Sequence, residues 1–207
     1  MTEKGYTMEA NPKIIDTIIK DQKIDSAKKV DTPAVKYTEG QLNQAKELDA
    51  KRTTLFKAGL GKEMCVAWDR PDLQFPVMIA STKASHPTVI EEQRLKRMAK
   101  CLSHRRRLVW RFEVLETPET IVVYTDSDWA GERPGRRSTS GGILCFGPAV
   151  VRTWSKMQRA VSLSSAEAEH VALIRGAQEA LALQSILIEL EMWLKIVLET
   201  DSAATKG

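Results

Sequence analysis

The order of the elements predicted between residues 121 and 201 constrains the fold more than any other feature of this sequence. Three short apolar runs precede one long helical pattern and a fourth run: IVVYTD (121–126), GGILCFG (141–147), AVVRTWS (149–155), the helix at 164–191 and LKIVLETD (194–201). Gly147 and Pro148 suit a tight turn between the second and third runs. A helical crossover between two strands of one sheet makes those strands parallel. We therefore expect an α/β fold whose mixed sheet is antiparallel over three strands and parallel at the fourth.

The residues before this region have a different pattern. Apolar residues recur at helical spacing over 12–24 and over 89–103, and polar segments that contain proline separate the helical stretches. The segment ETPET (116–120) then precedes the first strand. We therefore place a boundary near residue 115 and expect two parts, a mostly helical segment at 1–115 and an α/β domain at 116–207.

Composition limits the partners and the compartment. The net charge of +4 is compatible with a polyanionic partner and does not require one. The three cysteines are far apart and show no CxxC spacing, so we expect reduced thiols in an intracellular protein, cytoplasmic or nuclear, and no zinc site. The N-terminus has no apolar signal segment, and the most apolar late stretch carries Glu189, Glu191 and Lys195. We therefore expect no membrane partner.

Carboxylates end the first of the predicted strands. In an extended strand alternate residues share a face, so Asp126 and Asp128 continue the face of Val122 and Tyr124. An apolar face that becomes acidic at one end can present carboxylates in a cleft. A strand that ends in a solvated Asp-Ser-Asp turn explains the same residues, and these residues alone favour that simpler interpretation.

The helix and the last strand add further carboxylates. Glu169 begins the small and apolar stripe that would pack on the sheet, where a carboxylate is costly unless a metal or a basic group compensates for it. Glu167 stands three residues after Ser164, as in a capping box, and so has a structural role. Asp201 ends the last strand. We therefore expect Asp126, Glu169 and Asp201 to converge from two strands and one helix.

Three converging carboxylates suit a hard divalent cation. Mg²⁺ and Mn²⁺ prefer oxygen ligands, and Mg²⁺ keeps several waters and often takes substrate phosphates as further ligands. Two such ions about 3.5–4 Å apart can activate water and stabilise the leaving oxygen in phosphodiester hydrolysis. The sequence therefore predicts Mg²⁺ (or Mn²⁺) as the cofactor.

Four motifs in this region resemble a known family. They are DSDWAG (126–131), RRSTSG (136–141), WSKMQ (154–158) and LSSAEAE (163–169). With them, residues 121 to about 204 closely resemble the ribonuclease H domain of copia-type LTR-retrotransposon Pol polyproteins. Three upstream segments, DTPAV, RPDLQFPV and HPTVIEEQRLKRMAKCL, are similar to the family's segment that joins reverse transcriptase to ribonuclease H.

The resemblance implies an activity and a set of site residues. The activity is metal-dependent hydrolysis of the RNA strand of an RNA–DNA hybrid, on a mixed sheet flanked by helices. The catalytic and metal-binding residues would be Asp126, Glu169 and Asp201, and Asp128 would be either a supporting residue or part of a solvated turn. The implied partners are the hybrid and the rest of a Pol polyprotein.

The glycine-rich loop supplies the candidate nucleic-acid contacts. Arg133, Arg136 and Arg137 can contact phosphates, and Ser138 and Thr139 complete this predicted nucleic-acid-binding set. A solvated turn explains the same loop equally well.

The chain also departs from the family pattern. A fourth acidic residue, a fifth strand and later helices have no counterpart before Gly207, so we expect a ribonuclease H-like sheet that is incomplete at its C-terminus and has an exposed last strand. No Y-x-D-D motif is present, so we expect no DNA synthesis. Three alternatives stay open: a ribonuclease, a catalytically inactive remnant or nucleic-acid-binding module, and an interaction domain that uses its open edge.

Overall fold

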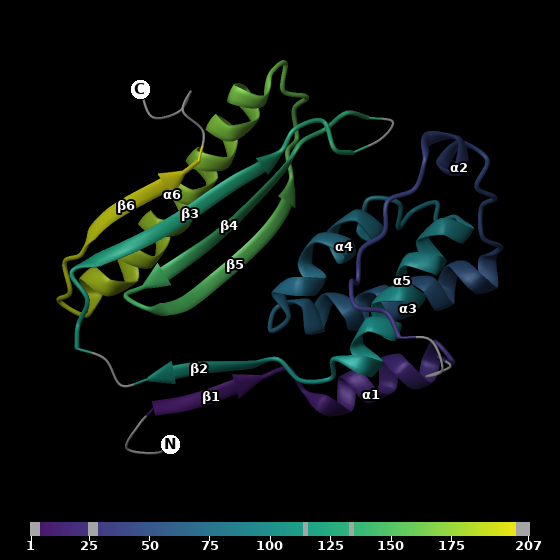
Figure 1. Ribbon diagram of the computed structural model, residues 1–207, viewed down its shortest axis with the longest axis horizontal. Helices are drawn as coiled ribbons and strands as arrows, with labels where there is room; N and C mark the ends of the chain where they lie inside the picture. The colour runs from purple at the N-terminus through teal and green to yellow at the C-terminus, as the bar shows by residue number, and fades with distance from the viewer. Residues whose placement is uncertain (1–4, 25–28, 114–115, 133–134, 202–207) are drawn as a thin grey trace. The chain divides into compact units, whose positions relative to one another are not determined.

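Two patterns of secondary structure follow one another along the chain, a helical one and then a mixed one (Figure 1). The computed structural model describes residues 5–24, 29–113, 116–132 and 135–201. These residues divide into two units, one from Thr7 to Trp110 and one that contains Arg111 onward together with Gly5 and Tyr6. The division falls within the paired strands β1 (Gly5–Glu9) and β2 (Val109–Glu113). The sequence did not lead us to expect this two-stranded ribbon.

The first unit is helical, as the sequence predicts. Its described helices are α1 (Pro12–Asp21), α2 (Glu39–Asn43), α3 (Ala50–Ala67), α4 (Pro71–Ser81) and α5 (Val89–His104). Asp49 caps the N-terminus of α3, since its carboxylate accepts a hydrogen bond from the backbone N–H of Arg52 at 2.8 Å. Helix α5 begins with a capping box in which Thr88 and Glu91 satisfy each other's backbone N–H groups. Local sequence therefore fixes where these helices begin.

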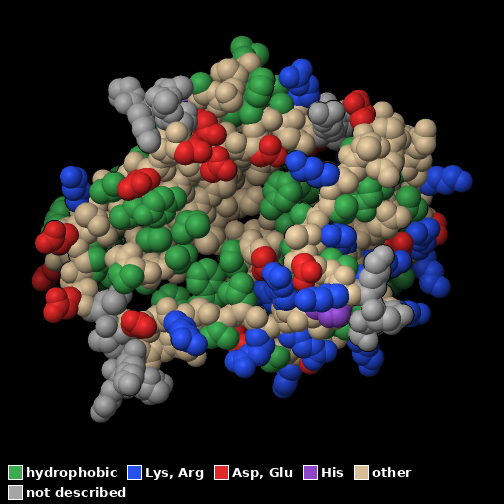
Figure 2. All heavy atoms as spheres, viewed as in Figure 1, with side chains coloured by type: hydrophobic (Ala, Val, Ile, Leu, Met, Phe, Trp, Pro, Cys, Tyr) green, Lys and Arg blue, Asp and Glu red, His purple; other side chains and the backbone are tan. Residues whose placement is uncertain are grey.

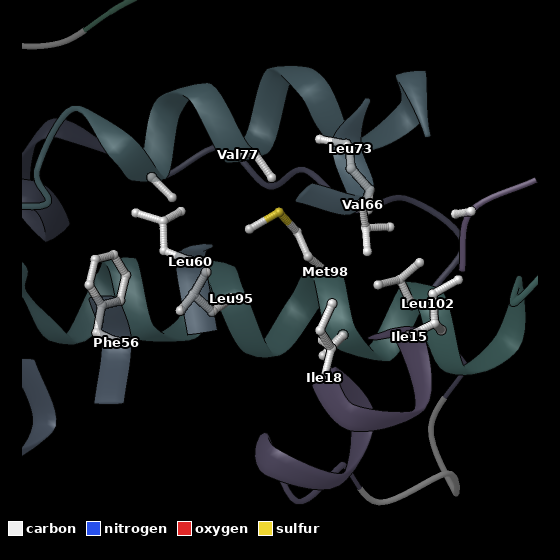
Figure 3. Close-up of a cluster of buried hydrophobic side chains, with 14 of the residues drawn as sticks. Ile15, Ile18, Phe56, Leu60, Val66, Leu73, Val77, Leu95, Met98 and Leu102 are labelled. Atoms are coloured by element: carbon white, nitrogen blue, oxygen red, sulfur yellow. The ribbon is translucent and has the colours of Figure 1, made fainter. Parts of the chain in front are cut away.

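Apolar side chains from four of the helices form the core of this unit (Figure 3). Met98 and Leu102 of α5 are fully buried, as is Leu73 of α4. Ile15 and Ile18 of α1 are almost fully buried. The other residues labelled in Figure 3 come from α3, α4 and α5: Phe56, Leu60, Val66, Val77 and Leu95. Burial of this apolar surface drives the helices together.

One buried residue of α3 does not fit an apolar core. Glu63 is fully buried, and neither of its carboxylate oxygens has a hydrogen-bond partner in the described part of the chain. Burial raises the pKa of the Glu63 carboxyl well above its usual range, because a charged carboxylate is poorly solvated there. The folded protein therefore keeps a proton on Glu63 at pH values where the unfolded chain has lost it.

This raised pKa predicts that the helical unit loses stability as pH rises. Between the unfolded pKa and the folded pKa of Glu63, the free energy of unfolding should fall by about 1.4 kcal/mol per pH unit. Glu63→Gln should remove this slope, because a neutral amide binds no proton in either state. Urea unfolding of both proteins between pH 5 and 7 measures the difference. The exposed Glu47→Gln serves as the control, and an equal slope in wild type and Glu63→Gln would contradict the prediction.

The second unit contains a four-stranded mixed sheet, as predicted. Its strands are β3 (Thr120–Asp128), β4 (Thr139–Phe146), β5 (Ala149–Met157) and β6 (Lys195–Thr200), in the order β5-β4-β3-β6. The pairs β3/β4 and β4/β5 are antiparallel, and β3/β6 is parallel. Gly147 turns the β4–β5 hairpin with a positive φ of 56°, which glycine adopts without strain. The predicted hairpin, crossover and parallel last strand are all confirmed.

Helix α6 (Ser165–Glu189) makes the crossover and packs on one face of the sheet (Figure 1). Gly176 permits a close approach, since a methyl group at this position would lie 2.5 Å from Thr125 Cγ2 and 3.1 Å from Val123 Cγ1. Glu179, also buried, forms ion pairs with Arg152 of β5 and with Arg175. These contacts fix the position of α6 along β3.

Helix α6 is also long and apolar enough to cross a membrane by length and composition, and among the described residues it alone meets this test. One such helix is weak evidence for a membrane span. Its sheet-facing residues Ala168, Ala172 and Ala180 are fully buried, and Glu179 is paired with the sheet. We therefore assign α6 to the fold of this unit.

Candidate metal centre

Two aspartates lie at the carboxyl ends of neighbouring parallel strands. The last paired positions of β3 and β6 in the parallel register are Thr125 and Thr200. Asp126 and Asp201 each follow these residues by one position and are exposed. Because parallel strands end at the same edge of a sheet, the pairing brings both carboxylates together.

The third carboxylate comes from the beginning of α6. Glu169 precedes Gly176 by seven residues, which is two helical turns, so both residues lie on the same side of the helix. Gly176 contacts β3 at Thr125, and Glu169 is therefore carried toward the end of the same strand. The close packing of helix on strand thus directs this carboxylate to Asp126.

The structure brings the three predicted residues together. Asp126, Glu169 and Asp201 each offer a carboxylate oxygen, and these three atoms lie within 4.8 Å of one another. Figure 2 shows a group of acidic side chains over this end of the sheet. Three anionic groups at this separation repel one another, and a bound cation removes that repulsion.

Hydrogen bonds from Ser127 orient Glu169. The hydroxyl of Ser127 donates to Glu169 Oε1 at 2.8 Å. The backbone N–H of Ser127 donates to the same oxygen at 3.2 Å and to Asp126 Oδ1 at 2.8 Å. The second oxygen, Glu169 Oε2, is buried and has no hydrogen-bond partner in the described part of the chain. One oxygen is thus held in place while the other is left to accept a ligand.

The residues fit a hard divalent cation. All three donors are carboxylates, and the described residues give the buried Oε2 atom of Glu169 no partner, although a buried polar atom requires one. Mg²⁺ and Mn²⁺ favour carboxylate oxygens and waters as ligands. The donor set and the orphaned oxygen are both explained by such an ion.

The role of Ser127 gives a testable prediction. Ser127→Ala removes the hydroxyl that orients Glu169, so we expect Mn²⁺ affinity to fall about 10-fold, at the low end of the effect of residues that orient metal ligands. Titration calorimetry with Mn²⁺ measures it. Ser127→Thr keeps a hydroxyl and should bind Mn²⁺ nearly as well as wild type. Equal affinity in wild type and Ser127→Ala would exclude this role.

A buried glutamine joins the strands to the start of α6. The side-chain amide of Gln158 donates to Ser140 Oγ and to the carbonyl of Ala168, both at 2.9 Å, and its carbonyl accepts from Ser162 Oγ at 2.9 Å. Ala168 immediately precedes Glu169. Gln158 and Ser127 are thus structural supports of the site that the sequence did not single out. The WSKMQ and DSDWAG motifs contain them.

The predicted nucleic-acid-binding residues do not all lie in the same environment in the structure. Arg133 lies outside the described residues. Arg136 is exposed with a φ of +54°, and Arg137 pairs with Glu132 at 3.5 Å. None of these positions tests contact with a nucleic acid, so the three arginines stay predicted contacts.

Ser138 and Thr139, from the same predicted set, are buried. The hydroxyl of Ser138 accepts from the backbone N–H of Ala130 at 3.1 Å, and its carbonyl accepts from Gln158 N–H at 2.8 Å. These hydrogen bonds hold the loop to the sheet. We therefore assign Ser138 and Thr139 to the fold rather than to the surface that a nucleic acid could contact.

Two neighbours of Asp126 lie apart from the carboxylate cluster. The carboxylate of Asp128 lies against Gly131, in the turn that follows β3. Trp129 is partly exposed, and its indole N–H donates to the carbonyl of Ser162 at 3.1 Å. Of the two roles considered for Asp128, its position favours the turn.

Comparison with known proteins relates the chain to a family. A 111-residue stretch, 54% of this chain, is 40% identical to the Secreted RxLR effector protein 161 of Plasmopara viticola and covers 78% of that protein. The chain belongs to the family of this protein. No protein-family model matches the chain, and no solved structure matches it.

The chain is also homologous to copia-type retrotransposon Pol polyproteins. It is 29% identical over 188 residues, 90% of its length, to the Retrovirus-related Pol polyprotein from transposon RE1 of Arabidopsis thaliana. It is 29% identical over 180 residues, 82% of its length, to that from transposon RE2. The matches span only 12% and 11% of these polyproteins, so the chain corresponds to a small part of each.

Proposed function

We propose that the second unit is a metal-dependent ribonuclease H, which hydrolyses the RNA strand of an RNA–DNA hybrid. The observation that supports this most is the convergence of Asp126, Glu169 and Asp201 from two strands and one helix. The homology to retrotransposon Pol polyproteins supports it independently. The β5-β4-β3-β6 sheet with α6 on one face is consistent with a ribonuclease H-like fold.

Mg²⁺ or Mn²⁺ would be held by the same three carboxylates. When bound, such an ion lowers the pKa of a bound water and stabilises the charge that develops on the phosphate. Ser127 would keep Glu169 Oε1 in place, so that Oε2 faces the ion. Asp126 and Asp201, both exposed, would keep the ion accessible to a phosphodiester from solvent.

Arg136 is exposed and its backbone N–H donates to the carbonyl of Glu132 at 2.7 Å, which favours contact of its side chain with the phosphates of the hybrid. Further partners in the same proposal are the remaining parts of a Pol polyprotein. A ribonuclease that acts on such hybrids would work inside the cell, in the cytoplasm or the nucleus.

A second candidate is a nucleic-acid-binding module without turnover. The exposed Arg136 supplies phosphate-binding charge that does not depend on the three carboxylates. In this case a hybrid would bind through basic residues such as Arg136, and loss of the carboxylates would leave binding intact.

The two candidates are separated by incubating the chain with labelled RNA–DNA hybrid, double-stranded DNA, double-stranded RNA and single-stranded RNA. The ribonuclease should cleave only the RNA of the hybrid, with Mg²⁺ or Mn²⁺, and EDTA should stop it. Binding of the hybrid without cleavage in either metal would support the second candidate. Equal cleavage of all RNA substrates would contradict ribonuclease H activity.

A further inference from the structure

Gly141 of β4 lies beside the candidate metal ligands. In the antiparallel register Gly141 is paired with Asp126 of β3 on one side and with Ser155 of β5 on the other. Directly paired residues project from the same face of a sheet. A side chain at position 141 would therefore stand between Asp126 and Ser155, next to the proposed site.

Packing explains why the neighbouring residue, Gly142, is a glycine, but it does not explain Gly141. A methyl group at Gly142 would overlap the indole of Trp154, which packs against the core of this unit. Among the described residues, a methyl group at Gly141 would meet nothing closer than 4.0 Å, the backbone oxygens of Asp126 and Trp154. Packing therefore requires glycine at 142 and leaves open space at 141.

The backbone does not require glycine at 141 either. Among the described glycines only Gly5 and Gly147 have a positive φ. The irregularity in the β4–β5 pairing falls between Leu144 and Cys145, not at Gly141. A glycine inside a strand weakens the sheet, and it commonly marks a bulge, a tight bend, or a place where a ligand or another backbone approaches closely. The bulge is elsewhere, and the nearest described backbone atoms belong to the paired strands at 4.0 Å, so the space at Gly141 suits the approach of a ligand.

We propose that the open space over Gly141 is the path of the RNA strand as it leaves the metal site. The inference rests on the proposed function, because it takes the scissile phosphate of the RNA strand to lie at Asp126. From there the sugar–phosphate backbone would cross β4 over Gly141 and reach β5 at Ser155. The exposed Arg159, two residues after the end of β5, supplies positive charge for phosphates near this end of the sheet.

Gly141→Val tests this path in the full chain. Valine suits a strand, so the thermal midpoint and the Mn²⁺ affinity should not fall. The affinity for a fluorescent RNA–DNA hybrid, measured by anisotropy in Ca²⁺, should fall at least 10-fold, and Gly141→Ala should give a smaller loss. Gly142→Val is the matched control, because it should lower the thermal midpoint through its overlap with Trp154.

The outcomes separate this inference from the proposed function. If Gly141→Val binds the hybrid as tightly as wild type, the path over Gly141 is wrong and the proposed function stands. If Gly141→Val lowers the thermal midpoint as much as Gly142→Val does, the glycine has a structural reason and the inference is overturned. If wild type binds Mn²⁺ but no hybrid, the proposed function and this inference fail together.

Discussion

Asp126→Asn should cleave the RNA–DNA hybrid at least about 100-fold more slowly than wild type, which corresponds to a loss of about 2.7 kcal/mol of transition-state stabilisation. Asparagine has the size of aspartate but lacks its charge, so it is a much poorer ligand for Mg²⁺. Asp126 is exposed, and its substitution removes no buried contact. We therefore expect the thermal midpoint to stay within about 1 °C of wild type. Initial rates of cleavage of the labelled RNA strand, at saturating Mg²⁺, measure the loss.

Asp128→Asn is the matched control for this experiment. Asp128 is an exposed aspartate on the same strand, two residues away, and its carboxylate lies against Gly131 rather than in the cluster. Its substitution should change the rate less than about 5-fold, within about 1 kcal/mol. Equal losses in the two variants, or full activity of Asp126→Asn, would contradict the assignment of Asp126. The inactive variant also shows whether a contaminating nuclease contributes to the signal.

The second large effect is expected on stability, from Gly176→Val. A valine Cβ would lie 2.5 Å from Thr125 Cγ2, closer than two non-bonded carbon atoms can approach, and Thr125 is itself buried. Helix α6 must then move away from β3 or the strand must shift. Overpacking of this kind lowers the free energy of unfolding by about 1–3 kcal/mol. The same movement displaces Glu169, so Mn²⁺ affinity should fall with stability.

Gly61→Val provides the control for Gly176→Val. Gly61 is also inside a helix, α3, but a methyl group there would have no neighbour within 4 Å in the part of the chain that the structure describes. This change should alter stability by no more than about 0.5 kcal/mol. Urea unfolding of both variants, with Mn²⁺ titration of each, compares them. A Gly176→Val variant as stable as Gly61→Val would show that α6 does not need to approach β3 so closely.

The sequence was sufficient for the elements whose signals are local. The runs before Asp126 and Asp201 are apolar and β-branched, and the Gly147–Pro148 turn joins two strands, so the hairpin and the parallel last strand were predicted correctly. The carboxylate cluster was predictable for the same reason, since the ends of parallel strands meet at one edge.

Features that depend on distant partners were not predicted. The ribbon of β1 and β2 pairs segments about one hundred residues apart, and its Tyr6–Phe112 stacking, at 4.7 Å, leaves no local pattern. Gln158 and Ser127 are polar residues whose importance comes from hydrogen bonds to α6. Glu63 resembles any helical glutamate until the packing of α3 buries it. In each case tertiary contacts decided the role.

The central claim is that the carboxylates of Asp126, Glu169 and Asp201 together bind a divalent cation, Mg²⁺ or Mn²⁺. Titration calorimetry with Mn²⁺ tests this claim most directly. Wild type should bind Mn²⁺, and Asp126→Asn, Glu169→Gln and Asp201→Asn should each weaken binding at least about 10-fold, because each removes a ligand. Asp128→Asn should bind as wild type does. Absence of Mn²⁺ binding by the folded wild-type chain, or equal affinity in all four variants, would contradict the claim.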